Sequence, residues 1–134
     1  MAKIFCVENK KFKYCDIEFD LPKPNYTADT LVELKKNYPD LNFSIIMGED
    51  NLIGLETWKN FEKILEGKIY VYPRINQDKK DAKLKNHHSV IFSDAPIMKI
   101  SSSEIRRIIN NKGWYLNLVP NKIHNYISEN NLYR

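Results

Sequence analysis

The pattern of apolar and polar positions divides this chain into short segments with the periodicity of strands or of helices. Four runs are rich in β-branched, aliphatic or aromatic residues and end at glycine, proline or polar residues, which predicts strands. These four runs are residues 12–19, 42–47, 69–72 and 89–92. The second run is short and uninterrupted, a pattern typical of a buried strand in a parallel sheet.

Other segments repeat their apolar residues at helical spacing. Leu31, Leu34 and Tyr38 share one helical face, which begins after the N-cap hydroxyl of Thr27 and ends at Pro39. Residues 74–86 are polar and predict a loop. Further helices are expected at residues 2–8, 58–65, 101–111 and 120–129.

Strands and helices therefore alternate, which favours an α/β fold with a parallel sheet and helices on its faces. The length suits a single small domain over residues 1–134. A doubly wound nucleotide-binding sheet normally opens with a strand and a phosphate-binding turn. Only a short helical stretch precedes the first expected strand, so we expect a partial domain whose beginning is missing.

Composition and charge exclude some classes of function. The formal charge is +4 and the pI is near 9.0, which suits an anionic ligand, but Lys and Arg are spread too evenly for a nucleic-acid interface. No apolar stretch approaches the roughly 20 residues of a membrane span, and the N-terminus lacks a signal-peptide pattern. Cys6 and Cys15 form no CxxC pair and are expected to be reduced thiols. We therefore expect a cytoplasmic protein that binds neither nucleic acid nor membranes.

The segment from residue 100 to residue 107 could bind phosphate. Ser101 and Glu104 have the spacing of a capping box. Free backbone N–H groups, serine hydroxyls and Arg106 at this helix start could cradle a polyphosphate. The alternative is a well-capped amphipathic helix without a ligand, and the pattern alone favours that alternative.

Three further positions have two interpretations each. Gly48 and Asp50 follow an apolar strand, where ligands bind in open α/β sheets, but Asp50 could instead cap a helix that begins at Asn51. Trp58 is either part of the core or a platform for an aromatic ring. Thr27 either only starts a helix or also faces a ligand.

His87 and the neighbouring His88 are expected to be solvated and His124 to pack or lie at the surface, with no metal site.

The motifs, taken in order, resemble those of the nicotinate-mononucleotide adenylyltransferase family of NAD biosynthesis. They are PNYTADTL at residues 24–31, IIMGEDNL at 45–52, TW at 57–58, YPR at 72–74, ISSSEIR at 100–106 and LVPNKIHNYISENNLY at 118–133. The resemblance covers the chain from about Asp16 to its last residue and implies a Rossmann-like nucleotidyltransferase fold. The TW and YPR segments match the nicotinate enzymes better than sister transferases that act on phosphopantetheine.

The resemblance implies a reaction and its partners. The phosphate of nicotinate mononucleotide attacks the α-phosphorus of ATP, with Mg²⁺ accompanying ATP, and gives nicotinic acid adenine dinucleotide and pyrophosphate. The ATP-binding residues that it implies are Gly48 and Asp50 near the adenosine ribose and Ser102, Ser103 and Arg106 at the phosphates. Those that it implies for nicotinate mononucleotide are Thr27, Trp58 as a stacking ring, and Arg74 as a phosphate contact.

The family's N-terminal HxGH segment, which stabilises the transferring phosphoryl group, does not occur in this sequence. The resemblance therefore implies a partial domain that lacks the first βαβ unit of the family. We therefore assign no catalytic residue and expect the isolated chain to be inactive. The alternative function is a non-catalytic nucleotide-binding or oligomerising fragment. Apolar residues such as Ile45, Met47, Ile69 and Val71 are expected to lack packing partners, which would favour self-association.

Overall fold

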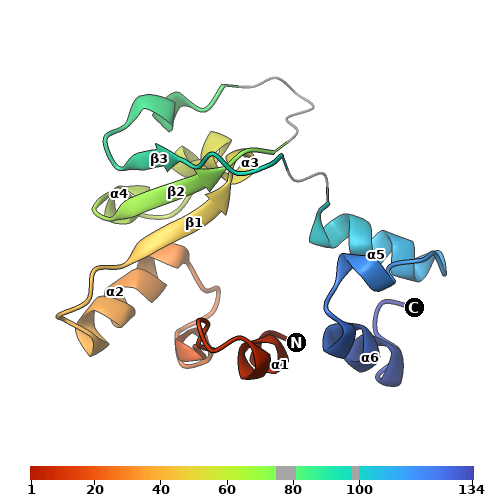
Figure 1. The fold of residues 1–134 in the computed structure, drawn as a ribbon. Coiled ribbons are helices and arrows are strands. Elements are labelled where there is room, and N and C mark those ends of the chain that lie inside the picture. The colour runs from red at the N-terminus through yellow and green to blue at the C-terminus, as the bar shows by residue number, and fades with distance from the viewer. Residues whose placement is uncertain (75–80, 98–99) are drawn as a thin grey trace. The chain divides into compact units, whose positions relative to one another are not determined.

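A computed structural model describes residues 1–74, 81–97 and 100–134 (Figure 1). The chain divides into two compact units, Asp16–Lys99 and Met1–Cys15 with Ile100–Arg134. We call them the sheet unit and the helical unit and describe each by itself. The expectation of one domain over residues 1–134 stays a prediction.

The sheet unit contains a three-stranded parallel sheet in the order β1-β2-β3 (Figure 1). Its register aligns Ile45 with Ile69 and Ile69 with Val90. The strands are β1 (Ser44–Gly48), β2 (Lys68–Tyr72) and β3 (Val90–Phe92). The helices are α2 (Thr27–Asn37), α3 (Glu49–Ile53) and α4 (Phe61–Leu65). The predicted α/β class with a parallel sheet is confirmed.

One face of this sheet is buried under helices. Met47, Ile69 and Val71 lie in its core, with Leu52 and Ile64 from α3 and α4. The expectation that this face lacks packing partners was therefore wrong. The error has a physical cause: the helices that follow β1 carry enough apolar side chains to cover the face that points toward them.

The opposite face is the open one. Ile46 pairs in register with Tyr70, and Tyr70 with Ile91. Their side chains are 76%, 41% and 37% exposed. We call this row of Ile46, Tyr70 and Ile91 the open sheet face.

Two predicted elements differ in the structure. Residues 12–19 form no strand: the chain is irregular except for a 3-10 turn at Ile17–Phe19. Strand propensity needs a neighbouring strand and a packed face, and Phe19 is 76% exposed here. The helix expected from Trp58 begins at Phe61, because Asn60 has a left-handed backbone with φ of 52°.

Two shorter revisions concern loops and caps. The expected loop over residues 74–86 contains a 3-10 turn at Lys83–Asn86, and its residues 75–80 lie outside the described part. Pro120, expected to be the first residue of the last helix, is instead its N-cap, so the helix begins one residue later, at Asn121. Such one-residue shifts at helix ends are common.

The helical unit has its own small core. It contains α1 (Ala2–Glu8), α5 (Ser102–Asn110) and α6 (Asn121–Glu129). Ile109, Tyr115, Ile123 and Ile127 are its buried residues. The described helices include none with the length and apolar character needed to cross a membrane.

Candidate functional site

The first group of predicted site residues lies at the carboxyl ends of β1 and β2. Gly48 is the last residue of β1, and Asp50 lies in the first turn of α3. Arg74 follows β2 and donates from Nη1 to Oδ2 of Asp50 at 3.0 Å. The structure thus brings Gly48, Asp50 and Arg74 together, and we call them the strand-end group.

Crowding explains the glycine in this group. A Cβ atom at position 48 would lie 2.4 Å from Oδ1 of Asp50 and 2.7 Å from Cδ of Arg74. The backbone there has φ of −76° and ψ of 154°, which any residue adopts. Gly48 is therefore needed for space beside the two charged side chains, not for its conformational freedom.

The structure decides between the two interpretations of Asp50 as a helix residue. The helix α3 begins at Glu49, its N-cap is Gly48, and no side chain caps it. Asp50 is therefore not the cap of a helix beginning at Asn51. Its side chain is 52% exposed, so the carboxylate is accessible from solvent while it pairs with Arg74.

The second group surrounds the start of α2. Thr27 is the first residue of α2, and its hydroxyl is not the N-cap, because Tyr26 holds that position. Trp58 is half-buried and packs against the core of the sheet unit. The next residue, Lys59, lies with its Nζ 4.5 Å from the centroid of the Tyr26 ring and 3.0 Å from Oδ2 of Asp29.

We call this group of five residues the Trp58 patch. It connects the TW segment with the start of α2 and consists of Tyr26, Thr27, Asp29, Trp58 and Lys59. Lys59 connects the two, since it follows Trp58 in the chain and contacts Tyr26, the N-cap of α2, and Asp29 in the first turn of that helix. The sequence interpretation missed Lys59. A cation next to a tryptophan in a motif was the available signal, but its contacts lie 30 residues away in the chain.

The third group lies at the start of α5 in the helical unit. The Ser101 hydroxyl accepts a hydrogen bond from the Glu104 backbone N–H at 3.1 Å, which confirms the predicted N-cap. The Arg106 guanidinium donates to the hydroxyls of Ser102 and Ser103, each at 3.4 Å. All three side chains are exposed, so their donors converge at the solvent-facing start of the helix. We call Ser102, Ser103 and Arg106 the serine–arginine group.

The amphipathic interpretation of α5 holds as well. Ile109 is buried, and Ile105 and Ile108 pack against the same core. The Glu104 carboxylate accepts from Arg107 at 3.3 Å. A buried apolar face and an exposed polar start are therefore properties of the same helix, and neither excludes the other.

The remaining candidates do not form a site. The rings of His87 and His88 are tilted by 36° with centroids 4.3 Å apart, and the His124 ring lies 5.0 Å from that of Tyr115. The described residues contain no group of three or more His, Cys, Asp or Glu side chains that could hold a metal ion. The strand-end group and the Trp58 patch belong to the sheet unit, and the serine–arginine group belongs to the helical unit.

The chain is similar in sequence to bacterial proteins of one kind. It is 49% identical over 125 residues to a probable nicotinate-nucleotide adenylyltransferase of Flavobacterium psychrophilum, and covers 65% of that protein. It is 40% identical over 134 residues to the probable enzyme of the same name from Cytophaga hutchinsonii, and covers 69% of it. The chain thus spans about two thirds of the length of these relatives. No family model matches it.

The fold is similar to that of a solved structure. The Plasmodium falciparum nicotinic acid mononucleotide adenylyltransferase complexed with APC matches 97% of this chain and 71% of its own, with a TM-score of 0.76 and 22% sequence identity. The same enzyme complexed with NaAD matches 81% of this chain with a TM-score of 0.66. At such identity the likeness concerns the fold, and the sequence relatives decide the family. This chain belongs to the nicotinate-nucleotide adenylyltransferase family.

Proposed function

We propose that this chain provides substrate-binding surfaces of an enzyme that transfers AMP from ATP to nicotinate mononucleotide. The observation that supports this most is the grouping of the family-like motifs into three exposed polar sites with suited chemistry. Three features suit a ribose, a nicotinate ring and a phosphate respectively. They are a carboxylate at a strand end, the half-buried indole of Trp58 followed by a lysine whose ammonium lies over the Tyr26 ring, and converging hydroxyl and guanidinium donors.

In this proposal the strand-end group binds a nucleotide ribose and the serine–arginine group binds phosphate, each within its own unit. The Asp50 carboxylate accepts hydrogen bonds from ribose hydroxyls, and Gly48 leaves room for the sugar to approach. Ser102, Ser103 and Arg106 donate to phosphate oxygens at a helix start, where backbone N–H groups add further donors. Mg²⁺ is the cation that ATP carries on its phosphates, as is usual for nucleotide substrates.

Nicotinate mononucleotide binds at the Trp58 patch in this proposal. The indole of Trp58 stacks on the pyridine ring, and Thr27 presents its hydroxyl and the free N–H groups of the first turn of α2. Lys59 places a positive charge near the ring's carboxylate. Arg74 is the remaining candidate for a phosphate contact, in exchange for its bond to Asp50.

Catalysis needs more than these binding groups. The sequence contains three histidines, at positions 87, 88 and 124, and none of them lies in an HxGH sequence. Loss of one group that stabilises charge in the transition state typically costs about 10²–10³ in rate. We therefore expect this chain alone to bind substrates weakly and to show no turnover. The proposed cellular location is the cytoplasm.

Two measurements on the same protein test the proposal. Pyrophosphate release with ATP, Mg²⁺ and nicotinate mononucleotide should stay at background, and clear turnover would contradict the assigned role. Fluorescence of Trp58, isolated by Trp114→Phe, should be quenched saturably by nicotinic acid adenine dinucleotide. Trp114 is 74% exposed, so its replacement leaves the core intact. A protein that shows neither quenching nor turnover would refute substrate binding by this chain.

The open sheet face supports self-association as a second role. Ile46, Tyr70 and Ile91 form a contiguous apolar row, and exposed apolar patches often mark interaction sites. Ile46→Lys should shift the chain toward monomer in sedimentation velocity. Val32→Lys, at an apolar position 55% exposed on α2, is the matched control. A wild-type chain that remains monomeric at high concentration would refute this role.

A further inference from the structure

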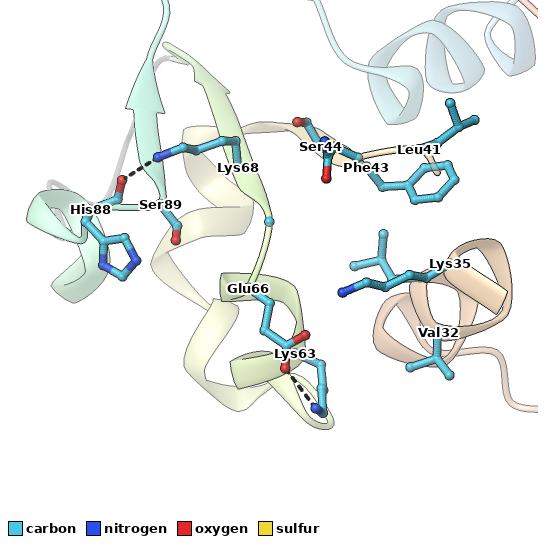
Figure 2. A pocket seen from close by; sticks show the side chains of 13 residues that line it. Val32, Lys35, Leu41, Phe43, Ser44, Lys63, Glu66, Lys68, His88 and Ser89 are labelled. Carbon is cyan, nitrogen blue, oxygen red and sulfur yellow. Dashed lines mark hydrogen bonds and ion pairs between the residues drawn. The ribbon is translucent and has the colours of Figure 1, made fainter. Parts of the chain in front are cut away.

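A cavity of about 310 Å³ lies at the amino ends of the strands, at the opposite end from Gly48 and Asp50. Ser44 and Lys68, the first residues of β1 and β2, line it, and so does Ser89, which directly precedes β3. The helix α2 forms the other side (Figure 2). No predicted site residue lines this cavity, although Leu31, the last residue of the PNYTADTL motif, is part of its wall.

One wall of the cavity is apolar. Leu31 and Val32 of α2 contribute to it, together with Leu41 and Phe43 from the segment that leads into β1. Figure 2 shows Leu41 and Phe43 on the same side of the cavity as α2. Val32 and Leu41 are 55% and 54% exposed. This wall therefore offers apolar surface that a ligand could remove from water.

The charge in the cavity is positive. Three lysines and one carboxylate line it, namely Lys35, Lys63, Lys68 and Glu66. Lys63 donates to Glu66 at 2.8 Å, and this hydrogen bond, with the charge of Lys63, lowers the pKa of the Glu66 carboxyl. Glu66 therefore stays ionised and neutralises Lys63, which leaves two cations in excess.

The two other lysines occupy different sides. Lys68 donates to the backbone carbonyl of His88 at 3.2 Å, a partner without net charge. Lys35 extends from α2 into the cavity on the side of Glu66 (Figure 2), and its charge also lowers the pKa of that carboxyl. Neither ammonium group is matched by a carboxylate of its own among the described residues that line the cavity. In Figure 2 the Lys68 ammonium points toward His88 and the Lys35 ammonium toward Glu66, so an anion in the cavity would draw both flexible side chains toward itself.

We propose that this cavity binds a small organic anion, with a phosphate or carboxylate head between Lys35 and Lys68 and an apolar or aromatic body against Leu41 and Phe43. The volume admits a group the size of a substituted benzene ring, and half-open sites with exposed lysines hold such ligands at about millimolar strength. The site lies in the sheet unit alone and is independent of the proposed adenylyl transfer.

Phenyl phosphate and benzoate are the probes, followed by amide chemical shifts of the labelled chain. Saturable shifts at Ser44, Gly67 and Ser89 with either probe support the site, and the stronger probe identifies the preferred head group. Inorganic phosphate and benzyl alcohol each carry half of the chemistry and should bind more weakly. Equal binding by either one, or no saturable shift at those amides, overturns the proposal.

A pair of neighbouring lysines provides the control. Lys35→Gln and Lys68→Gln should each weaken phenyl phosphate binding about two- to fivefold. Lys36→Gln removes the adjacent charge, which pairs with Glu33 outside the cavity, and should change nothing. If Lys36→Gln weakens phenyl phosphate binding as much as Lys35→Gln does, the effect is one of overall charge and the proposed site is overturned. The site is also overturned if saturating nicotinic acid adenine dinucleotide displaces phenyl phosphate.

Discussion

Gly48→Ala separates the function of the strand-end group from its contribution to stability. The added methyl group would lie 2.4 Å from Oδ1 of Asp50 and 2.7 Å from Cδ of Arg74. Both atoms belong to flexible side chains, so they swing away and the 3.0 Å ion pair between them is lost or rearranged. The carboxylate that is proposed to hold the ribose then leaves its position.

The expected cost in stability is small because two effects oppose each other. Exposed ion pairs contribute about 0–1 kcal/mol, and the Asp50 side chain is 52% exposed. Replacing glycine by alanine in an allowed backbone conformation stabilises by about 0.4–1 kcal/mol through the unfolded chain. No second effect offsets the loss in binding. A hydrogen bond from a ribose hydroxyl to the charged Asp50 carboxylate is worth about 1.5–3 kcal/mol, so its loss should lower dinucleotide affinity about 10- to 100-fold.

Dinucleotide titration and urea unfolding of the same variant measure the two quantities. Gly54→Ala is the matched control, because a Cβ atom there meets only a backbone oxygen at 4.0 Å, and Gly54 ends the same helix α3. Wild-type affinity in Gly48→Ala, or an equal loss in Gly54→Ala, would refute the reasoning. A fall in the free energy of unfolding above about 2 kcal/mol would show that the flexible side chains do not move as argued.

Three further predictions test the two units separately. Ser101→Ala removes the cap of α5 and should lower the free energy of unfolding of the helical unit by about 1 kcal/mol, measured by amide exchange; unchanged protection of α5 contradicts it. Leu55→Ala leaves a cavity at a core position that is 0% exposed, so the free energy of unfolding of the sheet unit in urea should fall by about 2–5 kcal/mol. A fall of less than about 1 kcal/mol would show that the core is loosely packed. Lys59→Met keeps the side-chain stem and should reduce the preference for nicotinate over nicotinamide mononucleotide about two- to fivefold in fluorescence titrations, whereas an unchanged ratio would exclude Lys59 from recognition.

The ligand roles of the candidate site residues stay predictions, but the structure shows where these residues lie. Gly48, Asp50 and Arg74 were chosen from motifs 24 residues apart, and the structure brings them together at the ends of adjacent parallel strands. Their proximity follows from a general rule, because parallel strands place all their carboxyl ends at one edge. Lys59 was missed because no rule of spacing links it to Asp29 across the fold.

The sequence by itself determined the elements that depend on neighbouring residues. The apolar runs of β1 and β2 and the cap of α5 by Ser101 are local signals, and the structure agrees with them. The family motifs are local signals too, and the sequence relatives confirm the family. The failures have the opposite character. Residues 12–19 have strand composition but lack a partner strand, and Asn60 adopts a left-handed backbone that shortens the expected helix.

Only the tertiary structure decided which face of the sheet is covered and where charges meet. Ile45 and Ile46 are chemically identical neighbours, yet the first packs against the core and the second is 76% exposed. Alternation along a strand assigns them to opposite faces, but the position of α3 and α4 decides which face becomes the interior. The partners of Asp50 and Lys59 and the lysine-lined cavity at the other end of the strands are likewise long-range consequences of chain packing.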